Sequence, residues 1–218
     1  KKDPKLHQLY ENYVLAFHSE LQQHVQYLHE KNDPLFSSHF LMVQSTGLKV
    51  CRNLKKKKCF DDLKKKLEEM TSGSCAITQT ISKYLVRASC MLSKLYLNEN
   101  QFDKSLAVLS TIEGRLSFEM NKELFLEVMI AKSSCFCKMQ KYDRAIMLLS
   151  QVINEDCVSS LRVRAMLYRA KIYEALHRPD LAVKQLEACA RKGGDWAKIA
   201  KRRLEKSYGY IWDERVAS

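Results

Sequence analysis

Glycine and proline are scarce in this sequence of 218 residues, which contains six glycines and three prolines. Because tight turns and linkers draw heavily on both residue types, a sheet-rich chain with many hairpins and a flexible linker are disfavoured. Hydrophobic residues make up 46% of the chain, which is enough to bury a core and argues against bulk disorder. No apolar run approaches the roughly 18 residues that a membrane span requires, so we expect no such span.

Motifs of known chemistry are missing as well. The sequence holds no glycine-rich phosphate loop, no G-x-S-x-G nucleophile elbow and no H-E-x-x-H zinc helix. His7, His18, His24 and His29 are spaced so that no two share a helical face at i, i+4, which weakens a metal site. We therefore expect no catalytic residues, no metal and no cofactor. An enzyme whose groups converge from distant helices is the alternative.

The eight cysteines are scattered and form no C-x-x-C pair. Most of them lie within apolar helical patterns, where a free thiol behaves as a small buried hydrophobe. The sequence shows no secretory signal either, so we expect reduced thiols and a cytoplasmic or nuclear location.

The charge of the chain is one-sided, with 37 Lys and Arg against 25 Asp and Glu and a net charge of +12 at pH 7. The excess is +4 over residues 1–80, +1 over residues 81–159 and +7 over residues 160–218. Basic regions of this kind attract acidic proteins, phosphates or anionic lipids, and charge alone does not choose among them.

Hydrophobic periodicity predicts helices at the start of the chain. Apolar residues at steps of three and four over residues 6–28 predict one long helix that ends near residues 32–34. Helical spacing is interrupted by the four lysines at 55–58 and resumes over residues 60–70. The clearest loop in the chain is the small polar stretch at residues 71–74.

A five-residue pattern then recurs along the chain. The pattern begins with a bulky residue, the anchor. Counted from the anchor, a new helix starts at position +6, a small residue follows at +9, and apolar residues follow at +13 and +16. The copies are Tyr96, Phe102, Ser105, Leu109 and Ile112; Phe136, Tyr142, Ala145, Leu149 and Val152; Tyr173, Pro179, Ala182, Leu186 and Cys189; and, more weakly, Leu54, Phe60, Leu63, Leu67 and Met70. This spacing predicts antiparallel helix pairs whose small residue allows close approach.

At these residues the sequence resembles the tetratricopeptide repeat family. The family's small positions are matched by Ser93, Ser133 and Ala170 before the turn, and by Ser105, Ala145 and Ala182 after it. The resemblance covers residues 82–192 well and 47–72 poorly. Successive +9 positions of the four copies (63, 105, 145 and 182) lie 42, 40 and 37 residues apart instead of 34, and the family's early tryptophan and closing proline are missing. A helical bundle that happens to share this spacing is the alternative.

The resemblance implies an all-α fold, an antiparallel helix-pair solenoid with irregular repeats of 37–42 residues. We expect a single domain over residues 1–218, with N-terminal helices at 1–46, helix pairs at 47–192, and a capping helix and tail at 193–218. The last of these is amphipathic, with Trp196 and Leu204 on its apolar side and basic residues on the other, as a capping helix requires.

In such a solenoid the first helix of each pair lines the concave side, which selects a surface for a partner. Helical spacing away from the seam predicts that this surface holds the partner-binding residues Arg87, Lys94, Lys138, Arg164 and Lys171, with Ile130 and Leu167 between them. The cations fit an acidic segment through charge-assisted hydrogen bonds. The peptide-carboxylate clamp of some family members uses asparagines that these positions lack, so we do not expect that activity. A solvated charged face is the plainer interpretation.

Basic residues near the two ends raise a second hypothesis, contact with phosphate groups. The candidates are Lys55, Lys56, Lys57, Lys58, Lys198, Lys201, Arg202 and Arg203. The C-terminal group is the better one for nucleic acid, because Trp196, Tyr208 and Tyr210 accompany it and aromatic rings stack on bases.

The sequence thus predicts a non-enzymatic interaction scaffold or adaptor that docks partner subunits or an acidic peptide within a multi-subunit complex, with no small-molecule substrate. The alternative is a nucleic-acid-associated helical repeat protein that uses the basic terminal patches. Binding to RNA or DNA that weakens steeply with added salt would favour this alternative.

Overall fold

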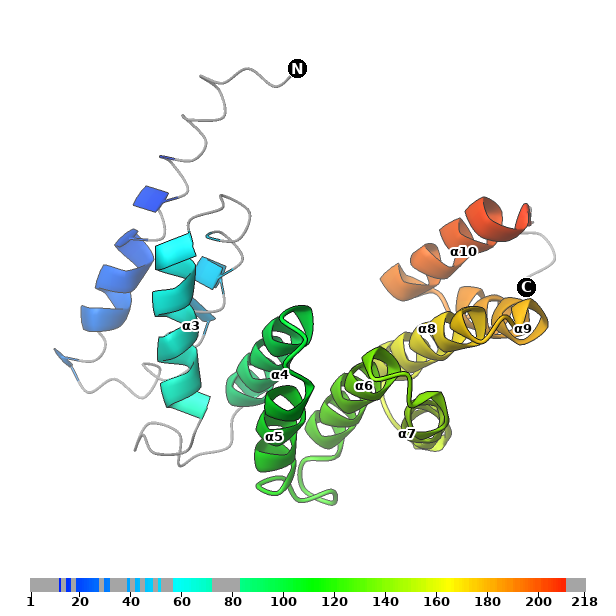
Figure 1. Cartoon of the computed structure of the whole chain (residues 1–218), viewed down its shortest axis with the longest axis horizontal. Coiled ribbons are helices and arrows are strands. Elements are labelled where there is room, and N and C mark those ends of the chain that lie inside the picture. The colour runs from blue at the N-terminus through cyan, green and yellow to red at the C-terminus, as the bar shows by residue number, and fades with distance from the viewer. Residues whose placement is uncertain are drawn as a thin grey trace. The chain divides into compact units, whose positions relative to one another are not determined.

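The computed structural model of the chain describes residues 57–71 and 83–210, together with short stretches before residue 52 of which 19–27 is the longest. All regular elements in these residues are helices, so the prediction of an all-α protein is confirmed (Figure 1). None of the described helices is long and apolar enough to cross a membrane. Contacts divide the chain into two compact units, Lys1–Tyr96 and Leu97–Ser218.

The predicted N-terminal helix is helical at residues 19–27, and most of its remaining residues lie outside the described ones. The same holds for residues 72–74 of the predicted loop, whereas Thr71 still belongs to the preceding helix. The prediction of a single domain with boundaries at 46/47 and 192/193 stays a prediction.

The first unit includes α3 (Lys57–Thr71) and most of α4 (Lys83–Asn98). Leu63 and Leu67 of α3 are buried, as the weak upstream copy of the pattern predicts. Lys57 and Lys58 belong to α3, so the interruption of helical structure expected at 55–58 does not extend over these two residues.

Tyr96 and Glu68 connect these two helices through a hydrogen bond. The Tyr96 hydroxyl of α4 donates to the Glu68 carboxylate of α3 at 2.6 Å, and the Lys64 ammonium lies 4.7 Å from the centre of the Tyr96 ring. Because Tyr96 is buried, the carboxylate satisfies a hydroxyl that would otherwise lose its hydrogen bond to water.

In its described residues, 97–210, the second unit contains six helices in sequence. They are α5 (Phe102–Glu113), α6 (Lys122–Lys138), α7 (Tyr142–Asn154), α8 (Ser159–Ala175), α9 (Pro179–Ala190) and α10 (Gly194–Tyr208). Each helix packs against the next, and α6, α8 and α10 also contact one another in turn. Within residues 97–210, no comparable contact joins α5 to α7 or α7 to α9. The helices α6, α8 and α10 therefore form one continuous row.

The turns that open α5, α7 and α9 have the same backbone form. Each holds one residue in the left-handed region four positions after the anchor: Asn100 (φ 59°), Gln140 (φ 60°) and His177 (φ 55°). The next residue's N–H reaches back to the anchor carbonyl, from Lys141 to Phe136 at 2.8 Å and from Arg178 to Tyr173 at 2.9 Å. This is the hydrogen-bond pattern of a helix that closes on a left-handed residue, a position usually held by glycine.

Replacing Gln140 with glycine should raise the free energy of unfolding by about 0.5–1 kcal/mol. A side chain in the left-handed region costs roughly 1–2 kcal/mol, and the larger backbone entropy of glycine in the unfolded chain offsets only part of the gain. Urea unfolding followed by tryptophan fluorescence measures the change. The matched control is Gln151→Gly inside α7, which should lower stability by about 1 kcal/mol. Equal losses in both variants would contradict the role of the turn.

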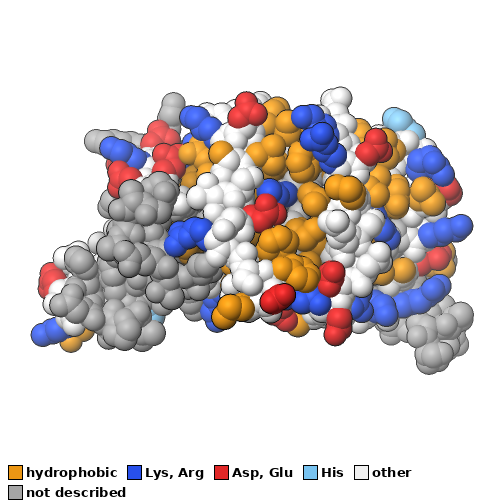
Figure 2. Space-filling model, turned by 90° about the horizontal axis from the view of Figure 1, so that it is seen from below, with side chains coloured by type: hydrophobic (Ala, Val, Ile, Leu, Met, Phe, Trp, Pro, Cys, Tyr) orange, Lys and Arg blue, Asp and Glu red, His pale blue; other side chains and the backbone are white. Residues whose placement is uncertain are grey.

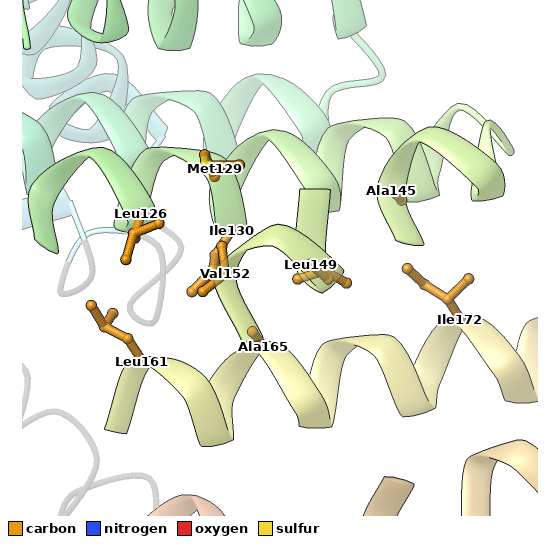
Figure 3. Close-up of a cluster of buried hydrophobic side chains, with 9 residues drawn as sticks. All are labelled: Leu126, Met129, Ile130, Ala145, Leu149, Val152, Leu161, Ala165 and Ile172. Atoms are coloured by element: carbon orange, nitrogen blue, oxygen red, sulfur yellow. The ribbon is translucent and has the colours of Figure 1, made fainter. Parts of the chain in front are cut away.

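The pattern's small and apolar positions form the core of the second unit. Ser105, Ala145 and Ala182 are fully buried where two helices approach, and the +13 residues Leu109, Leu149 and Leu186 are equally inaccessible. In Figure 3 the side chains of α6 and α8 face each other, and Leu149 and Val152 of α7 fill the space between them. The helix positions and the seam residues of these three copies are therefore as predicted.

A second core cluster forms where α10 packs on α8 and α9. Ala200 and Leu204 of α10 are buried against Val163, Leu167 and other residues of the preceding pair. The opposite side of α10 exposes Lys198 and Arg202. α10 thus covers the apolar end of the last helix pair and leaves polar residues outside.

Candidate protein-interaction surface

The two sets of helices in the second unit differ in charge. The row formed by α6, α8 and α10 carries 12 basic and five acidic residues, a net charge of +7. The helices α5, α7 and α9 carry three basic and five acidic residues, a net charge of −2. In Figure 2, Lys and Arg side chains gather toward the right-hand end of the view, and hydrophobic side chains spread over its middle. A positive charge bias of this kind attracts acidic groups in general.

Lys138 and Lys171 come from neighbouring helices and share one neighbourhood. Lys138 is the last residue of α6, where a cation also interacts favourably with the helix dipole, and Lys171 lies on α8. Both side chains are exposed. Burial raises the pKa of the Cys137 thiol, and the positive charges of both lysines act on the same thiol to lower it. Both ammonium groups therefore act on the same thiol, Cys137.

Arg164 extends this surface along α8. It lies seven residues, or two turns, before Lys171 and so on the same helical face, with Tyr168 between them. The Lys171 ammonium is 5.0 Å from the centre of the Tyr168 ring. Arg164 is half-buried, and its Nε atom is buried without a hydrogen-bond partner among the described residues. We call Lys138, Arg164 and Lys171 the basic row.

Two residues expected on this surface are not there. Ile130 and Leu167 are 3% and 1% exposed, so the prediction that they line a groove is wrong. The physical reason is that α6 and α8 each pack against several neighbouring helices, which buries more of their circumference than a single seam would.

The remaining two predicted contact residues lie in the first unit. Arg87 and Lys94 are exposed on α4 and are seven residues apart, which places them on one helical face. That they bind the same partner as the basic row stays a prediction.

The predicted phosphate contacts are distributed unevenly. Lys55 and Lys56 lie outside the described residues, and Lys57 and Lys58 are in the first turn of α3. On α10, Arg202 is exposed and Lys201 is half-buried. Lys198 pairs with Asp195 at 3.2 Å. Arg203 pairs through two nitrogens with Glu174 of α8, which occupies its guanidinium with a carboxylate of the chain itself.

The aromatic residues near these cations have structural roles. Trp196 and Tyr208 pack against the core cluster at α10, and the Tyr208 hydroxyl donates to Glu174 at 3.1 Å. Rings held in this way are not presented for stacking on bases. Tyr210 is 37% exposed.

Two thiols of the second unit, Cys137 and Cys189, are not activated as nucleophiles. Burial raises the pKa of Cys189 to about 11, and it also raises the pKa of Cys137. A thiol becomes a nucleophile when its pKa is lowered, so both shifts run in the wrong direction. Among the residues that the structure describes, no cluster of three His, Cys, Asp or Glu side chains is arranged to hold a metal ion.

Sequence reasoning missed one polar contact that orders the helix pairs. The Arg169 guanidinium of α8 donates at 2.8 Å to the Gln185 side chain of α9 and at 2.8 Å to the Ser150 hydroxyl of α7. Gln185 is buried, so this arginine fixes three helices around one point. These partners are 16 and 19 residues away along the chain, and no local pattern identifies them.

Comparisons with protein-family models, with curated proteins and with solved structures returned no match. The function of the surface is therefore inferred from the positions and charges of its own residues.

Proposed function

We infer that the second unit is a tetratricopeptide-like helical repeat module that docks an acidic segment of a partner protein on the basic row. The observation that carries this proposal is the charge bias of the helices, +7 on the row of α6, α8 and α10 and −2 on α5, α7 and α9. Such a bias orients an acidic partner toward one side and speeds its association.

The repeat character of the module is supported by its turns and its packing. A residue with left-handed backbone, a buried small residue and a buried leucine occur at the same offsets from the anchor in three successive copies. Direct contacts along α6, α8 and α10, without comparable contacts along α5, α7 and α9, are what a helix-pair solenoid curved toward the first helices would have.

The chemistry of the basic row favours carboxylates. Lys138 and Lys171 offer exposed ammonium groups, and Arg164 offers a planar guanidinium two turns before Lys171 on the same face of α8. Charge-assisted hydrogen bonds from such groups to Asp or Glu are roughly twice as strong as neutral ones. The chain then acts as a non-enzymatic adaptor within a larger assembly. The six cysteines in the described residues form no disulfide with one another, which supports the cytoplasm or the nucleus as its compartment.

Affinity purification with charge-reversal variants tests this proposal. The variant Lys138→Glu with Lys171→Glu should weaken capture of the partner roughly tenfold or more, because each reversal replaces an attraction by a repulsion worth about 1 kcal/mol. The matched control is Lys104→Glu with Lys184→Glu, which makes the same charge change on exposed positions of α5 and α9 and should leave capture intact.

The purification is run with and without nuclease. A partner that survives nuclease and is lost only from the Lys138 and Lys171 variant supports the proposal. Loss from both variants would show a dependence on net charge alone, and retention by both would remove the basic row from the interface. Recovery that collapses with nuclease would favour the nucleic-acid alternative.

A further inference from the structure

The loops that precede α6 and α8 lie at the same end of the second unit. Leu126 and Leu161, near the starts of these two helices, face each other at one end of the core cluster (Figure 3). Lys122 in the first turn of α6 pairs with Glu155 in the loop before α8, and their charged atoms are 3.0 Å apart. The loop before α6 and the loop before α8 are therefore neighbours.

Three large apolar side chains are exposed in these two loops. Phe118 is 39% exposed and Met120 is 85% exposed, both before α6, and Val158 is 42% exposed directly before α8. We call these three residues the loop patch. Apolar side chains that are exposed singly need no explanation, whereas exposed apolar side chains that gather in one place mark a binding surface.

The loop before α6 holds its apolar side chains in a fixed geometry. The Asn121 N–H donates to the Ser117 carbonyl at 2.8 Å, which closes a turn around Phe118 and Met120. The Phe118 ring packs edge-to-face on Phe125 with 5.4 Å between the ring centres, and Phe125 in turn packs against the core cluster. A surface that is ordered before a partner arrives loses less conformational entropy on binding.

Val158 occupies the N-cap of α8 without stabilising the helix through its side chain. Its carbonyl accepts hydrogen bonds from the N–H groups of Leu161 at 3.0 Å and Arg162 at 3.3 Å, but its side chain forms no cap hydrogen bond. Ser, Thr, Asn or Asp at an N-cap satisfies a free N–H of the helix, and valine cannot. Valine thus deprives α8 of a cap and adds exposed apolar surface, a combination that is expected of a contact residue.

Acidic residues surround the loop patch. Residues 115–123 and 155–158 hold four acidic and two basic residues, a net charge of −2 in a chain whose net charge is +12. The exposed acidic side chains among them are those of Glu119, Glu123 and Asp156. Cations on a partner are therefore attracted to this end of the second unit, although the chain as a whole repels them.

We propose that the loop patch binds a partner segment in which a large apolar side chain is flanked by Lys or Arg. The apolar contact supplies most of the affinity, Met120 adapts its unbranched side chain to the ligand, and the acidic side chains orient the segment. This surface is distinct from the basic row, because Glu123 and Lys138 lie fifteen residues, or about 22 Å, apart along α6. The two surfaces favour ligands of opposite charge.

Selection from a peptide library tests the proposal with a defined probe. Random peptides of about 12 residues displayed on phage are first depleted on the Phe118→Ser, Met120→Ser chain and then captured on the unchanged chain, so that peptides bound elsewhere are removed. The retained peptides should combine an aromatic or aliphatic residue with a net positive charge. An empty selection, or retained peptides that are neutral or acidic, would overturn the proposal.

Val158 gives the sharpest variant because its two expected effects are opposed. Val158→Ser should raise the urea midpoint, since serine caps α8, and should still raise the Kd of a retained peptide roughly threefold in fluorescence anisotropy. Met147→Ser, a matched change at an exposed position of α7, should leave the Kd as it is. An unchanged Kd in Val158→Ser, or an equal rise in Met147→Ser, would contradict the contact.

Neutralising the surrounding acids tests the charge of the ligand. Glu119→Gln with Asp156→Asn should raise the Kd of the same peptide roughly fivefold at low salt and less at high salt, because exposed charges are screened. Asp143→Asn with Glu205→Gln removes two exposed charges on α7 and α10 and should have little effect. Equal weakening by both pairs would show that net charge alone attracts the peptide, against the proposal.

Sedimentation of the chain without peptide tests a second copy as the occupant. The unchanged chain and Met120→Ser should sediment with the same mass. Self-association that Met120→Ser abolishes would assign the loop patch to a second copy and overturn the proposal. Lys138→Glu with Lys171→Glu should leave the peptide bound, so the loop patch and the basic row are tested separately.

Discussion

Replacing Leu149 with alanine is expected to lower the free energy of unfolding of the second unit by about 3 kcal/mol. Leu149 is completely buried in the core cluster that α6, α7 and α8 share (Figure 3). Removing three of its carbon atoms forfeits their transfer free energy and leaves a cavity, which the backbones of three packed helices cannot close.

Urea unfolding measures this loss, with fluorescence as the signal because both tryptophans of the chain, Trp196 and Trp212, lie in the second unit. The matched control is Met147→Ala, two residues earlier on α7, whose side chain is 56% exposed. This control should change stability by less than about 0.5 kcal/mol. Similar losses in the two variants would mean that α7 does not present Leu149 to the core.

Replacing Glu174 with alanine should cost about 2 kcal/mol and should loosen α10. The Glu174 side chain is 19% exposed and joins α8 to α10 through Arg203 and Tyr208. Its removal leaves a partly buried guanidinium and a hydroxyl without their acceptor. Because the pair is partly exposed, the effect is smaller than the 3–5 kcal/mol typical of a fully buried pair.

Hydrogen exchange read by mass spectrometry gives the location of this effect. Amides of α10 should exchange at least roughly tenfold faster in Glu174→Ala, while those of α6 and α7 keep their protection. Glu205→Ala is the control, since Glu205 is exposed on the outer side of α10. Equal acceleration in all helices would show that Glu174 supports the whole unit instead of the position of α10.

The helix pairs could be predicted from the sequence because their signals are local. Tyr142 and Pro179 begin α7 and α9 as the spacing requires, and the small residues Ala145 and Ala182 are fully buried. Hydrophobic periodicity and a polar turn are enough to place such elements.

Long-range features could not be predicted in the same way. The spacing did not reveal that Ile130 and Leu167 are buried, because periodicity identifies one apolar face and these helices bury a second against more distant helices. The contact of Arg203 with Glu174 spans 29 residues. From the sequence alone Arg203 was therefore a candidate phosphate contact, whereas the structure pairs it with the Glu174 carboxylate.

The charge difference between the helices α6, α8 and α10 and the helices α5, α7 and α9 could be predicted only in part. It can be counted once the helices are assigned, because each helix has its own net charge. Its meaning depends on the contacts that place α6, α8 and α10 in one row, and those contacts are long-range. The candidate surface is therefore predictable in composition, whereas its geometry required the structure.

Carbodiimide cross-linking of the purified complex tests most directly whether the basic row receives a partner's carboxylates. This reagent joins a lysine amine to an Asp or Glu carboxylate with no spacer, and the pair Lys122 and Glu155, 3.0 Å apart, serves as an internal standard. We predict that partner carboxylates are joined to Lys138 and Lys171 and not to Lys104 or Lys184. Cross-links found at Lys104 and Lys184 but not at Lys138 or Lys171 would contradict the account.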